Sequence, residues 1–506
     1  RSYCNTCTGV AYVYAYKPTA DEPSYWVQLI TKPNNLYEVQ VIGSVNLADE
    51  YLKEVAKPAP VTSNSAMPTP ALNETKVKYK MSKDLKRVVI TGMGAITPLG
   101  NSVDAFWQNI VAGKSGVDFI TKFDSSHFKT KFAAEVKGFN PALYFERNEA
   151  RKYDLFTQYA VAAADEALKH AQINLEILNK NKIGVIWGSG NGGIQTFQEQ
   201  LIEFVKGTGQ PRFNPYFIPK IIADIPSGVI SIRYGLRGLN FSTISACASS
   251  ATAIIDAFNY IRLGKADVII AGGSEAAIVE SGLAGFNASK ALSTRNEEPQ
   301  KASRPFDVKR DGFVMGEGGG AMVIESLESA LARGATIIAE VAGGGMAADA
   351  YHLTGTHPDG EGAYSGMLDA LDDAGITPDA IDYINAHATS TVMGDESELR
   401  AITRVFGERA SLNISGTKSM TGHLLGASGA IEAIITAKAI QENIIPPTAN
   451  TDEVEPEWKD KLNITLGSAQ YKEVNYAMSN TFGFGGHIAS VILKKYSLDK
   501  TTNINN

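Results

Sequence analysis

Short, continuous apolar runs alternate with longer stretches of helical periodicity from Arg87 onward, and this alternation constrains the fold more than any other feature. The apolar runs lie at 88–90, 183–187, 268–270 and 383–384, and the clearest helical stretches at 248–263 and 427–440. Runs that are both short and continuously apolar are typical of strands buried on both faces. With helices between them, they predict an α/β fold with a mainly parallel sheet covered by helices.

The bulk composition excludes several classes of protein. The chain has 506 residues, of which 44% are hydrophobic and 20% charged, and a net charge of −7. This charge argues against nucleic-acid binding, although a local basic patch stays compatible with it. No apolar run approaches the ~20 residues that span a bilayer, so no membrane insertion is expected. The three cysteines, Cys4, Cys7 and Cys247, cannot form a disulfide framework, and we expect a cytoplasmic protein.

Changes in composition divide the chain into five parts. Residues 1–55 contain strand-like alternation and form a small β-containing segment without an assignment. Residues 56–80 mix prolines with Ser, Thr and Asn, which predicts a flexible linker. The α/β pattern then fills two halves, 81–335 and 336–496, and residues 497–506 are expected to be a disordered tail.

Each half places a reactive side chain directly after a strand-like run. Cys247 follows 241–245, and His387 follows 382–385. Parallel α/β sheets bind their ligands at the carboxyl ends of the strands. We therefore expect two related βα halves whose equivalent strand ends share one site, although no clear sequence repeat supports a duplication.

Cys247 is the candidate nucleophile. A thiol at the turn from a strand into a helix lies near the free N–H groups and partial positive charge of the helix N-terminus, which lower the thiol pKa. Its small neighbours Ala246 and Ala248 leave room for a substrate. A buried structural cysteine is the alternative interpretation.

Two of the seven histidines, His387 and His423, lie among small residues. Beside a thiol they suggest a Cys-His-His site, because imidazoles stabilise negative charge on a substrate oxygen or move protons. Hydrogen-bonded core histidines are the alternative. Lys418 and Glu432 flank His423 and could form a buried pair, either tuning the histidine or purely structural. The glycine-rich 480–486 segment offers unobstructed N–H groups, suited either to an oxyanion hole or to a simple turn.

Six motifs occur in the order found in a known enzyme family. They are RVVITGMGAITPLG at 87–100, SACASS at 245–250, RPFDVKRDGFVMGEG at 304–318, HATST at 387–391, TKSMTGHLLGASGA at 417–430 and NTFGFGG at 480–486. Through them, residues 86–496 resemble the 3-oxoacyl-[acyl-carrier-protein] synthase II family, the condensing enzymes of type II fatty acid synthesis.

The resemblance implies a thiolase-like fold, that is, α/β with duplicated βα halves and mixed five-stranded sheets in an αβαβα layering, and a homodimer. It implies an acyltransferase that elongates fatty acids. The reaction is the decarboxylating condensation of an acyl chain, bound to acyl carrier protein, with malonyl-acyl carrier protein. The substrates are carried on the phosphopantetheine of acyl carrier protein, and neither a metal nor another cofactor is expected.

The resemblance also assigns roles to residues at matching positions. The catalytic set is Cys247 as nucleophile, His387 and His423 as the decarboxylation pair, and the active-site lysine Lys418. The supporting acidic residues are Glu432 and Asp395. The oxyanion hole uses the backbone N–H groups of Cys247 and Phe484, and Phe484 is also the gate. The substrate-binding residues are Thr389 and Thr391 for the phosphopantetheine arm, and Phe286 and Asn191 for the acyl pocket.

The chain departs from the family pattern at several positions. Ala388 stands where glycine is usual, and Ile488 where asparagine is usual, which predicts a lost loop hydrogen bond. Asn191 replaces a common apolar pocket residue. An unpaired amide is costly to bury against an alkyl chain, so we hypothesise a shorter, more polar or unsaturated acyl substrate. The candidate residues for docking the acidic carrier protein are Lys290, Arg295 and Lys301, with surface solubility as the alternative.

Three other functions compete with this interpretation. A thiolase-type acyltransferase usually needs a second cysteine late in the chain, and none follows Cys247. A non-catalytic chain-length factor generally lacks the nucleophile, which this chain retains. A ketosynthase of a specialised polyene or polyketide pathway stays open, because Asn191 is compatible with it.

Overall fold

The computed structural model describes residues 10–16, 24–31, 37–45, 85–207 and 210–497, the first three ranges by their backbone alone. The chain divides into two compact units, Arg1–Lys80 and Met81–Asn506. The expected linker at 56–80 and the pair Cys4 and Cys7 lie outside the described residues, as does the expected tail except for its first residue.

The first unit contains a three-stranded antiparallel sheet in the order β1-β2-β3. Its strands are β1 (Val10–Tyr16), β2 (Ser24–Thr31) and β3 (Tyr37–Val45). This sheet agrees with the strand-like alternation of the sequence.

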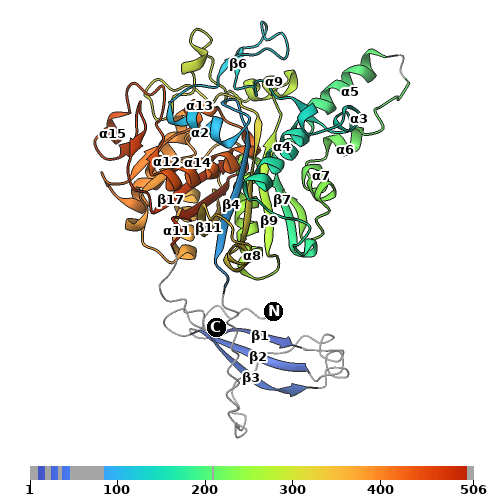
Figure 1. Ribbon diagram of the computed structural model, residues 1–506. Helices are drawn as coiled ribbons and strands as arrows, with labels where there is room; N and C mark the ends of the chain where they lie inside the picture. Colours follow the sequence, from blue (N-terminus) through green and yellow to red (C-terminus); the bar gives the residue numbers. More distant parts are fainter. Residues whose placement is uncertain (1–9, 17–23, 32–36, 46–84, 208–209, 498–506) are drawn as a thin grey trace, which may run out of the picture. The chain divides into compact units, whose positions relative to one another are not determined.

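The second unit is built on an eleven-stranded mixed sheet in the order β15-β13-β12-β17-β18-β11-β4-β10-β9-β7-β8 (Figure 1). The strands of its first half are β4 (Val88–Ile96), β7 (Ile183–Gly188), β8 (Asn240–Thr243), β9 (Val268–Glu275) and β10 (Gly318–Ser326). Those of its second half are β11 (Ala339–Ala348), β12 (Tyr383–Asn385), β13 (Asn413–Ser415), β15 (Asn463–Ile464), β17 (Tyr476–Gly483) and β18 (His487–Lys494). Two-stranded sheets pair β5 (Asp118–Phe119) with β6 (Phe132–Ala133), and β14 (Ile444–Ile445) with β16 (Gln470–Tyr471).

The large sheet consists of two five-stranded sheets that meet along a short edge, with the two-residue β15 added at one end. Strands β4 and β11 pair only through Val88–Ile90 and Ala339–Val341. In each half three parallel strands continue into two antiparallel ones, in the order β8-β7-β9-β10-β4 and β13-β12-β17-β18-β11. The expected fold of two related βα halves is therefore confirmed.

This order corrects one expectation about the site. Cys247 follows β8, and the counterpart of β8 in the second half is β13, which leads toward His423. His387 follows β12, whose counterpart is β7. The expectation that Cys247 and His387 lie at equivalent strand ends is wrong, because β8 is the third strand of its half along the chain, whereas β12 is the second strand of its half.

Helices complete the layers. The helices are α2 (Val103–Val111), α3 (Arg147–Ala150), α4 (Leu155–His170), α5 (Ile194–Lys206), α6 (Phe217–Ile221), α7 (Ile225–Tyr234), α8 (Ser249–Arg262), α9 (Glu280–Ala288), α10 (Leu327–Ala332), α11 (Glu361–Ala374), α12 (Val392–Phe406), α13 (Lys418–Thr421), α14 (Ser428–Glu442) and α15 (Pro456–Lys459). Helices α8 and α14 pack against each other and against strands of both halves, whereas α4 covers β4 and β10, and α11 covers β11 and β18. The layering is therefore αβαβα, as expected.

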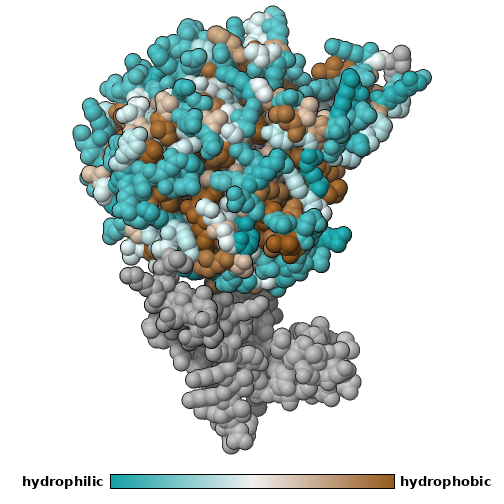
Figure 2. Space-filling view, viewed as in Figure 1, coloured by the Kyte–Doolittle hydropathy of each residue, from teal (hydrophilic) through white to brown (hydrophobic). Residues whose placement is uncertain are grey.

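The core follows these layers. The central layer buries Ile254 and Ile255 of α8 together with Ile434 of α14, all at most 2% exposed. Burying an aliphatic side chain of this kind contributes about 1.5–3 kcal/mol. Polar residues cover much of the visible surface, with apolar patches between them (Figure 2). Within the described part of the chain, no helix is long and apolar enough to cross a membrane.

Candidate active site

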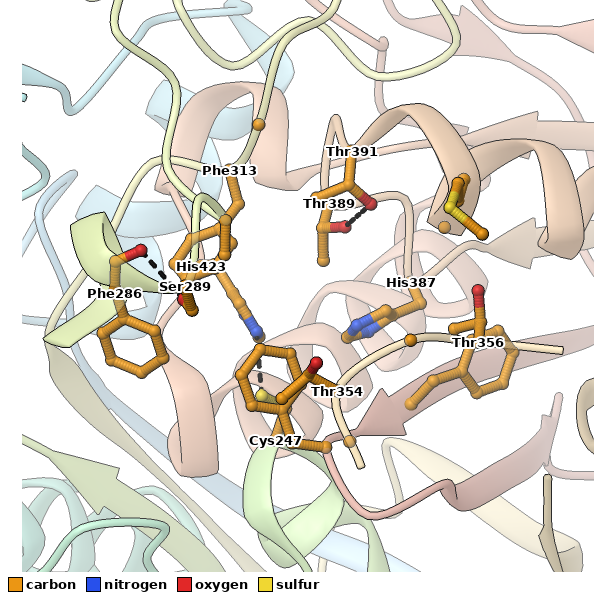
Figure 3. Close-up of a pocket in the computed structure, with 18 of the residues that line it drawn as sticks. Cys247, Phe286, Ser289, Phe313, Thr354, Thr356, His387, Thr389, Thr391 and His423 are labelled. Atoms are coloured by element: carbon orange, nitrogen blue, oxygen red, sulfur yellow. Dashed lines mark hydrogen bonds between the residues drawn. The ribbon is translucent and has the colours of Figure 1, made fainter. Parts of the chain in front are cut away.

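A cavity of about 360 Å³ opens at the carboxyl ends of the strands that precede Cys247 and His387. Figure 3 shows the thiol and the imidazoles of His387 and His423 turned toward one another inside it. The predicted site residues that line the cavity are Cys247, Phe286, His387, Thr389, Thr391, His423 and Phe484. Tertiary folding thus gathers residues that are separated by more than two hundred positions in the sequence.

Cys247 lies on a tight turn between β8 and α8. Ala246, directly before it, has a φ of 50°, a left-handed conformation that costs about 1–2 kcal/mol for a non-glycine residue. The Ser249 hydroxyl fixes the turn, since it donates to the Ala246 carbonyl at 2.6 Å and accepts from the Ser245 N–H at 3.0 Å. Gly483 packs against this turn, and a Cβ there would lie 2.6 Å from the Ser245 carbonyl oxygen.

Burial raises the pKa of the Cys247 thiol to about 12. The positive charge of Lys418 and hydrogen bonds from the backbone N–H groups of Phe484 and Cys247 lower this pKa, while the charge of Glu275 raises it. The N–H groups lower the thiol pKa as expected, but desolvation outweighs them, so the expected net depression of the pKa is wrong. Cys247 is a neutral thiol at pH 7.

His423 is the nearest proton-transfer group to the thiol. Its Nε2 lies 3.0 Å from Sγ of Cys247, and its Nδ1 lies 2.9 Å from the hydroxyl of Ser428. The ring of Phe313 meets the imidazole edge-on, with centroids 5.2 Å apart. These three contacts fix the ring plane of His423 against the sulfur.

His387 faces His423 across the cavity. The two imidazole centroids are 5.4 Å apart with their planes at 88°. The backbone N–H groups of His387 and Ala388 each donate to the buried carboxylate of Glu398 at 2.8 Å. Glu398 thus holds the peptide segment that carries His387.

The Lys418–Glu432 pair is confirmed as a buried contact and lies directly behind His387. Lys418 Nζ donates to the Glu432 carboxylate and, at 2.7 Å, to the His387 carbonyl, and lies 3.3 Å from Nδ1 of His387. Both side chains are at most 2% exposed. A buried ammonium that touches the imidazole and its backbone both positions the ring and acts on its charge.

Both imidazoles are neutral at pH 7. Burial, followed by the positive charge of Lys418, holds the pKa of His387 and of His423 well below its ordinary value. A neutral imidazole carries one N–H donor and one acceptor. The pair can therefore donate N–H bonds to a developing oxyanion or exchange a proton with a thiol.

Thr389 and Thr391 line the cavity mouth, and their hydroxyls are 3.1 Å apart. Asp395 lies behind them and accepts N–H bonds from Ser390 at 3.0 Å and Phe306 at 2.9 Å. Burial raises the pKa of Asp395 to about 6. The aspartate does not line the cavity but anchors the loop that presents the threonines.

Phe484 and Phe286 stand on the apolar side of the cavity, with ring centroids 6.3 Å apart. Phe484 follows β17 in the glycine-rich segment, and a hydrogen bond from its backbone N–H lowers the pKa of the Cys247 thiol. The backbone N–H groups of Cys247 and Phe484 are therefore suited to bind the carbonyl oxygen of a thioester on the cysteine when that oxygen becomes negatively charged.

Asn191 lies outside the lining of this cavity. It is exposed on the turn after β7, and its backbone N–H donates to the carboxylate of Glu275 at 3.1 Å. A hydrogen bond from its side chain lowers the pKa of Glu275. Because the amide is exposed and does not line the cavity, Asn191 gives little support to the hypothesis of a polar acyl substrate.

The other departures from the family pattern are accommodated by packing. Ala388 takes a φ of 36° and is buried, with its methyl group against Gly416. Ile488 is 4% exposed and packs in the core of the second half, where Gly366 makes room for it. Of the predicted docking residues, exposed Lys290 lines the cavity, whereas Arg295 donates to the Lys309 carbonyl and Lys301 pairs with Glu298.

Sequence reasoning missed the carboxylates Glu398 and Glu275, and also Ser428. Glu398 lies three residues after Asp395 on α12, so helical spacing on one face was an available signal. Glu275 ends a buried strand, where an ionisable residue is unusual. Across the described residues, no group of three or more His, Cys, Asp or Glu side chains is arranged to hold a metal ion.

Comparison with known proteins agrees with this geometry. The Beta-ketoacyl synthase, N-terminal domain, matches residues 85–330, and the Beta-ketoacyl synthase, C-terminal domain, matches residues 338–452. The 3-oxoacyl-[acyl-carrier-protein] synthase 2 of Staphylococcus aureus (strain COL) is 48% identical over 415 residues, which cover 81% of this chain and 99% of that protein.

Two solved structures extend the comparison. The ishigamide ketosynthase/chain length factor is 34% identical with a TM-score of 0.76, over 82% of this chain and 100% of its own. A type II PKS acyl-carrier protein in complex with its ketosynthase is 31% identical with a TM-score of 0.74, over 81% of this chain and 100% of that one. Both family domains and a 48% identical, almost fully covered relative show that the chain belongs to the beta-ketoacyl synthase family.

Proposed function

We propose that the protein catalyses the decarboxylating condensation of a carrier-bound acyl chain with malonyl-acyl carrier protein, giving 3-oxoacyl-acyl carrier protein in fatty acid elongation. The observation that supports this most strongly is the Cys247 thiol 3.0 Å from His423 Nε2, in a cavity that His387 also lines. Substrates carried on phosphopantetheine suit the site, because the threonine hydroxyls at the mouth offer hydrogen bonds to an amide-bearing arm.

In the first stage the acyl group moves to the enzyme. Sγ of Cys247 attacks the thioester carbonyl, and the N–H groups of Cys247 and Phe484 hold the oxyanion. The carbon–sulfur bond to the pantetheine thiol breaks, and the departing sulfur takes up the proton lost by Cys247, for which neutral His423 is the relay. One oxyanion-hole donor is typically worth about 3–4 kcal/mol.

In the second stage malonyl-acyl carrier protein loses carbon dioxide. The electron pair released from the breaking carbon–carbon bond forms an enolate, whose oxygen accepts hydrogen bonds from His387 and His423. The enolate carbon attacks the Cys247 thioester, the new carbon–carbon bond forms and the bond between the acyl carbon and the cysteine sulfur breaks. The released thiolate takes up one proton from water, for which His423 is the relay. Neutral imidazoles serve this stage well, because they donate hydrogen bonds without protonating the carbanion.

The carrier protein is acidic, so we infer that it docks at the cavity mouth beside Lys290. We expect Lys290→Glu to raise KM for acyl carrier protein with little change in kcat. Lys301→Glu is the matched control, because Lys301 is already paired with Glu298 at 2.9 Å. Equal effects of both substitutions would contradict docking at the mouth.

We also infer a homodimer. β8 is the outer strand of the large sheet, and apolar side chains near it are exposed, among them Ile232 at 82% and Ile244 at 64%. The arm made by α5 and α6 projects from the body in Figure 1 and carries further exposed apolar residues, including Val205 and Ile218. Patches of this kind mark protein interfaces. Sedimentation should give a dimer for the wild type and monomers for Ile244→Glu.

Mass spectrometry after incubation with acyl-acyl carrier protein tests the central proposal. Acylation should be confined to the peptide containing Cys247 and absent in Cys247→Ala, and malonyl-acyl carrier protein should then release carbon dioxide and 3-oxoacyl product. Acylation that persists in Cys247→Ala contradicts the proposal.

A second candidate function is a ketosynthase of a specialised polyene or polyketide pathway. The structural likeness to the ishigamide ketosynthase/chain length factor favours keeping it. A panel of acyl-carrier proteins separates the two: preference for saturated chains supports fatty acid elongation, and preference for polyunsaturated or oxygenated chains supports the specialised pathway.

A further inference from the structure

A buried carboxylate outside the catalytic set joins two turns beside the nucleophile. Glu275, the last residue of β9, is 0% exposed and accepts backbone N–H bonds from Gly190 at 2.8 Å, Asn191 at 3.1 Å and Gly426 at 3.1 Å. Among the described residues no cation forms an ion pair with it. The Ser189 hydroxyl also lies 3.5 Å from this carboxylate. Because no cation pairs with the buried carboxylate, hydrogen-bond donors of this kind stabilise it.

The donors come from two segments that are far apart in the sequence. Gly190 and Asn191 belong to the turn from β7 into α5, and Gly426 to the turn that connects His423 with α14. The turns are in direct contact, since a Cβ at Gly426 would lie 2.3 Å from the backbone nitrogen of Gly190. Glu275 therefore holds two backbone segments edge to edge.

Each turn delivers an apolar side chain to the surroundings of Cys247. Leu425, at a φ of 49°, lines the cavity beside the thiol, and Ile194 packs against the same apolar cluster as Cys247 and Phe286. Leu425 therefore borders the space open to an acyl chain on Cys247, whereas Ile194 lies in the apolar cluster that Cys247 also contacts. The contact between the two turns fixes how far apart these two side chains lie.

We propose that Glu275 is a positioning residue that sets the acyl-chain selectivity of the enzyme by clamping the two turns that carry Ile194 and Leu425. The proposal rests on the proposed function, because it concerns the acyl chain on Cys247. A carboxylate suits the task, since its two oxygens accept three N–H bonds together. A glutamine has one acceptor oxygen and an NH₂ group that would face another donor.

The test measures acylation of Cys247 by octanoyl- and palmitoyl-acyl carrier protein, using intact-protein mass spectrometry of the full chain. The readout is the ratio of the two rate constants for wild type, Glu275→Gln, Glu275→Asp and a control, Glu166→Gln. Glu166 is a suitable control, because it is half-buried, accepts N–H bonds from Ala95 and Val103 at 2.8 Å, and does not line the cavity.

We expect Glu275→Gln to change the ratio by about tenfold, the discrimination that one methylene gives in an apolar pocket. Glu166→Gln should leave the ratio unchanged even if it lowers the melting temperature. If Glu275→Gln does not fold, Glu275→Asp serves the same test, because a shorter carboxylate also moves the turns. A uniform loss of rate for both chains, or an equal change in Glu166→Gln, overturns the clamp alone. A wild-type chain that is not acylated at Cys247 overturns the proposed function as well.

Discussion

The Lys418–Glu432 pair allows the sharpest test of how this site is held together. Lys418→Met removes the cation and leaves the Glu432 carboxylate, 1% exposed, in an apolar environment where Oε2 already has no hydrogen-bond partner among the described residues. Removing one member of a buried ion pair costs about 3–5 kcal/mol. Replacing both members by apolar residues of similar size is often neutral, so Lys418→Met/Glu432→Leu should be more stable than Lys418→Met alone.

The pH dependence follows from the same contact. Burial raises the pKa of Glu432 to about 7, while Lys418 opposes this rise, so removing the lysine raises the pKa further. A carboxyl group whose pKa is higher in the folded state than in the unfolded state lowers the stability of the protein as pH climbs from the unfolded pKa through the folded pKa. The stability of Lys418→Met should therefore fall further below that of the wild type at pH 8.5 than at pH 6.

Melting temperatures at fixed protein concentration measure both effects. The wild type, Lys418→Met, Glu432→Leu and the double variant are compared at the two pH values. Condensation activity should be lost in all three variants. The reasoning is refuted if the double variant is less stable than Lys418→Met, or if the deficit of Lys418→Met does not grow with pH.

Three further predictions concern the nucleophile and its supports. Because the pKa of Cys247 is raised to about 12, its alkylation by iodoacetamide should be slow at pH 7.5 and keep rising beyond pH 10; a plateau below pH 8 would contradict the assignment. Gly483→Ala should destabilise the protein by about 1–3 kcal/mol and abolish acylation of Cys247, because the added methyl group would overlap the Ser245 carbonyl. Chemical denaturation measures the loss of stability, and mass spectrometry measures acylation. Normal acylation would disprove this prediction. Glu398→Gln leaves one buried N–H near His387 without an acceptor, which should lower the stability by about 1–3 kcal/mol. It should also slow malonyl decarboxylation more than acylation of Cys247. Equal slowing of the two half-reactions would count against this prediction.

The sequence by itself determined the class of fold and indicated the candidate catalytic residues of this protein. Strands and helices could be predicted because periodicity is a local property, and Cys247, His387, His423 and Lys418 could be predicted because each lies in a motif that is continuous along the chain. The relation of Glu432 to Lys418 was also accessible, since both lie in segments around the same histidine.

Only the tertiary structure decided what depends on distances between remote segments. The structure shows that β8 is the third strand of its half and β12 the second of the other, so Cys247 and His387 are not at equivalent strand ends; the sequence did not reveal all the strands that come before them. The protonation state of Cys247 follows from desolvation by the whole surrounding cavity, which outweighs the local helix N-terminus. Glu275 acquires its partners from turns that are about eighty-five and one hundred and fifty residues away, and a contact of that kind leaves no local pattern in a single sequence.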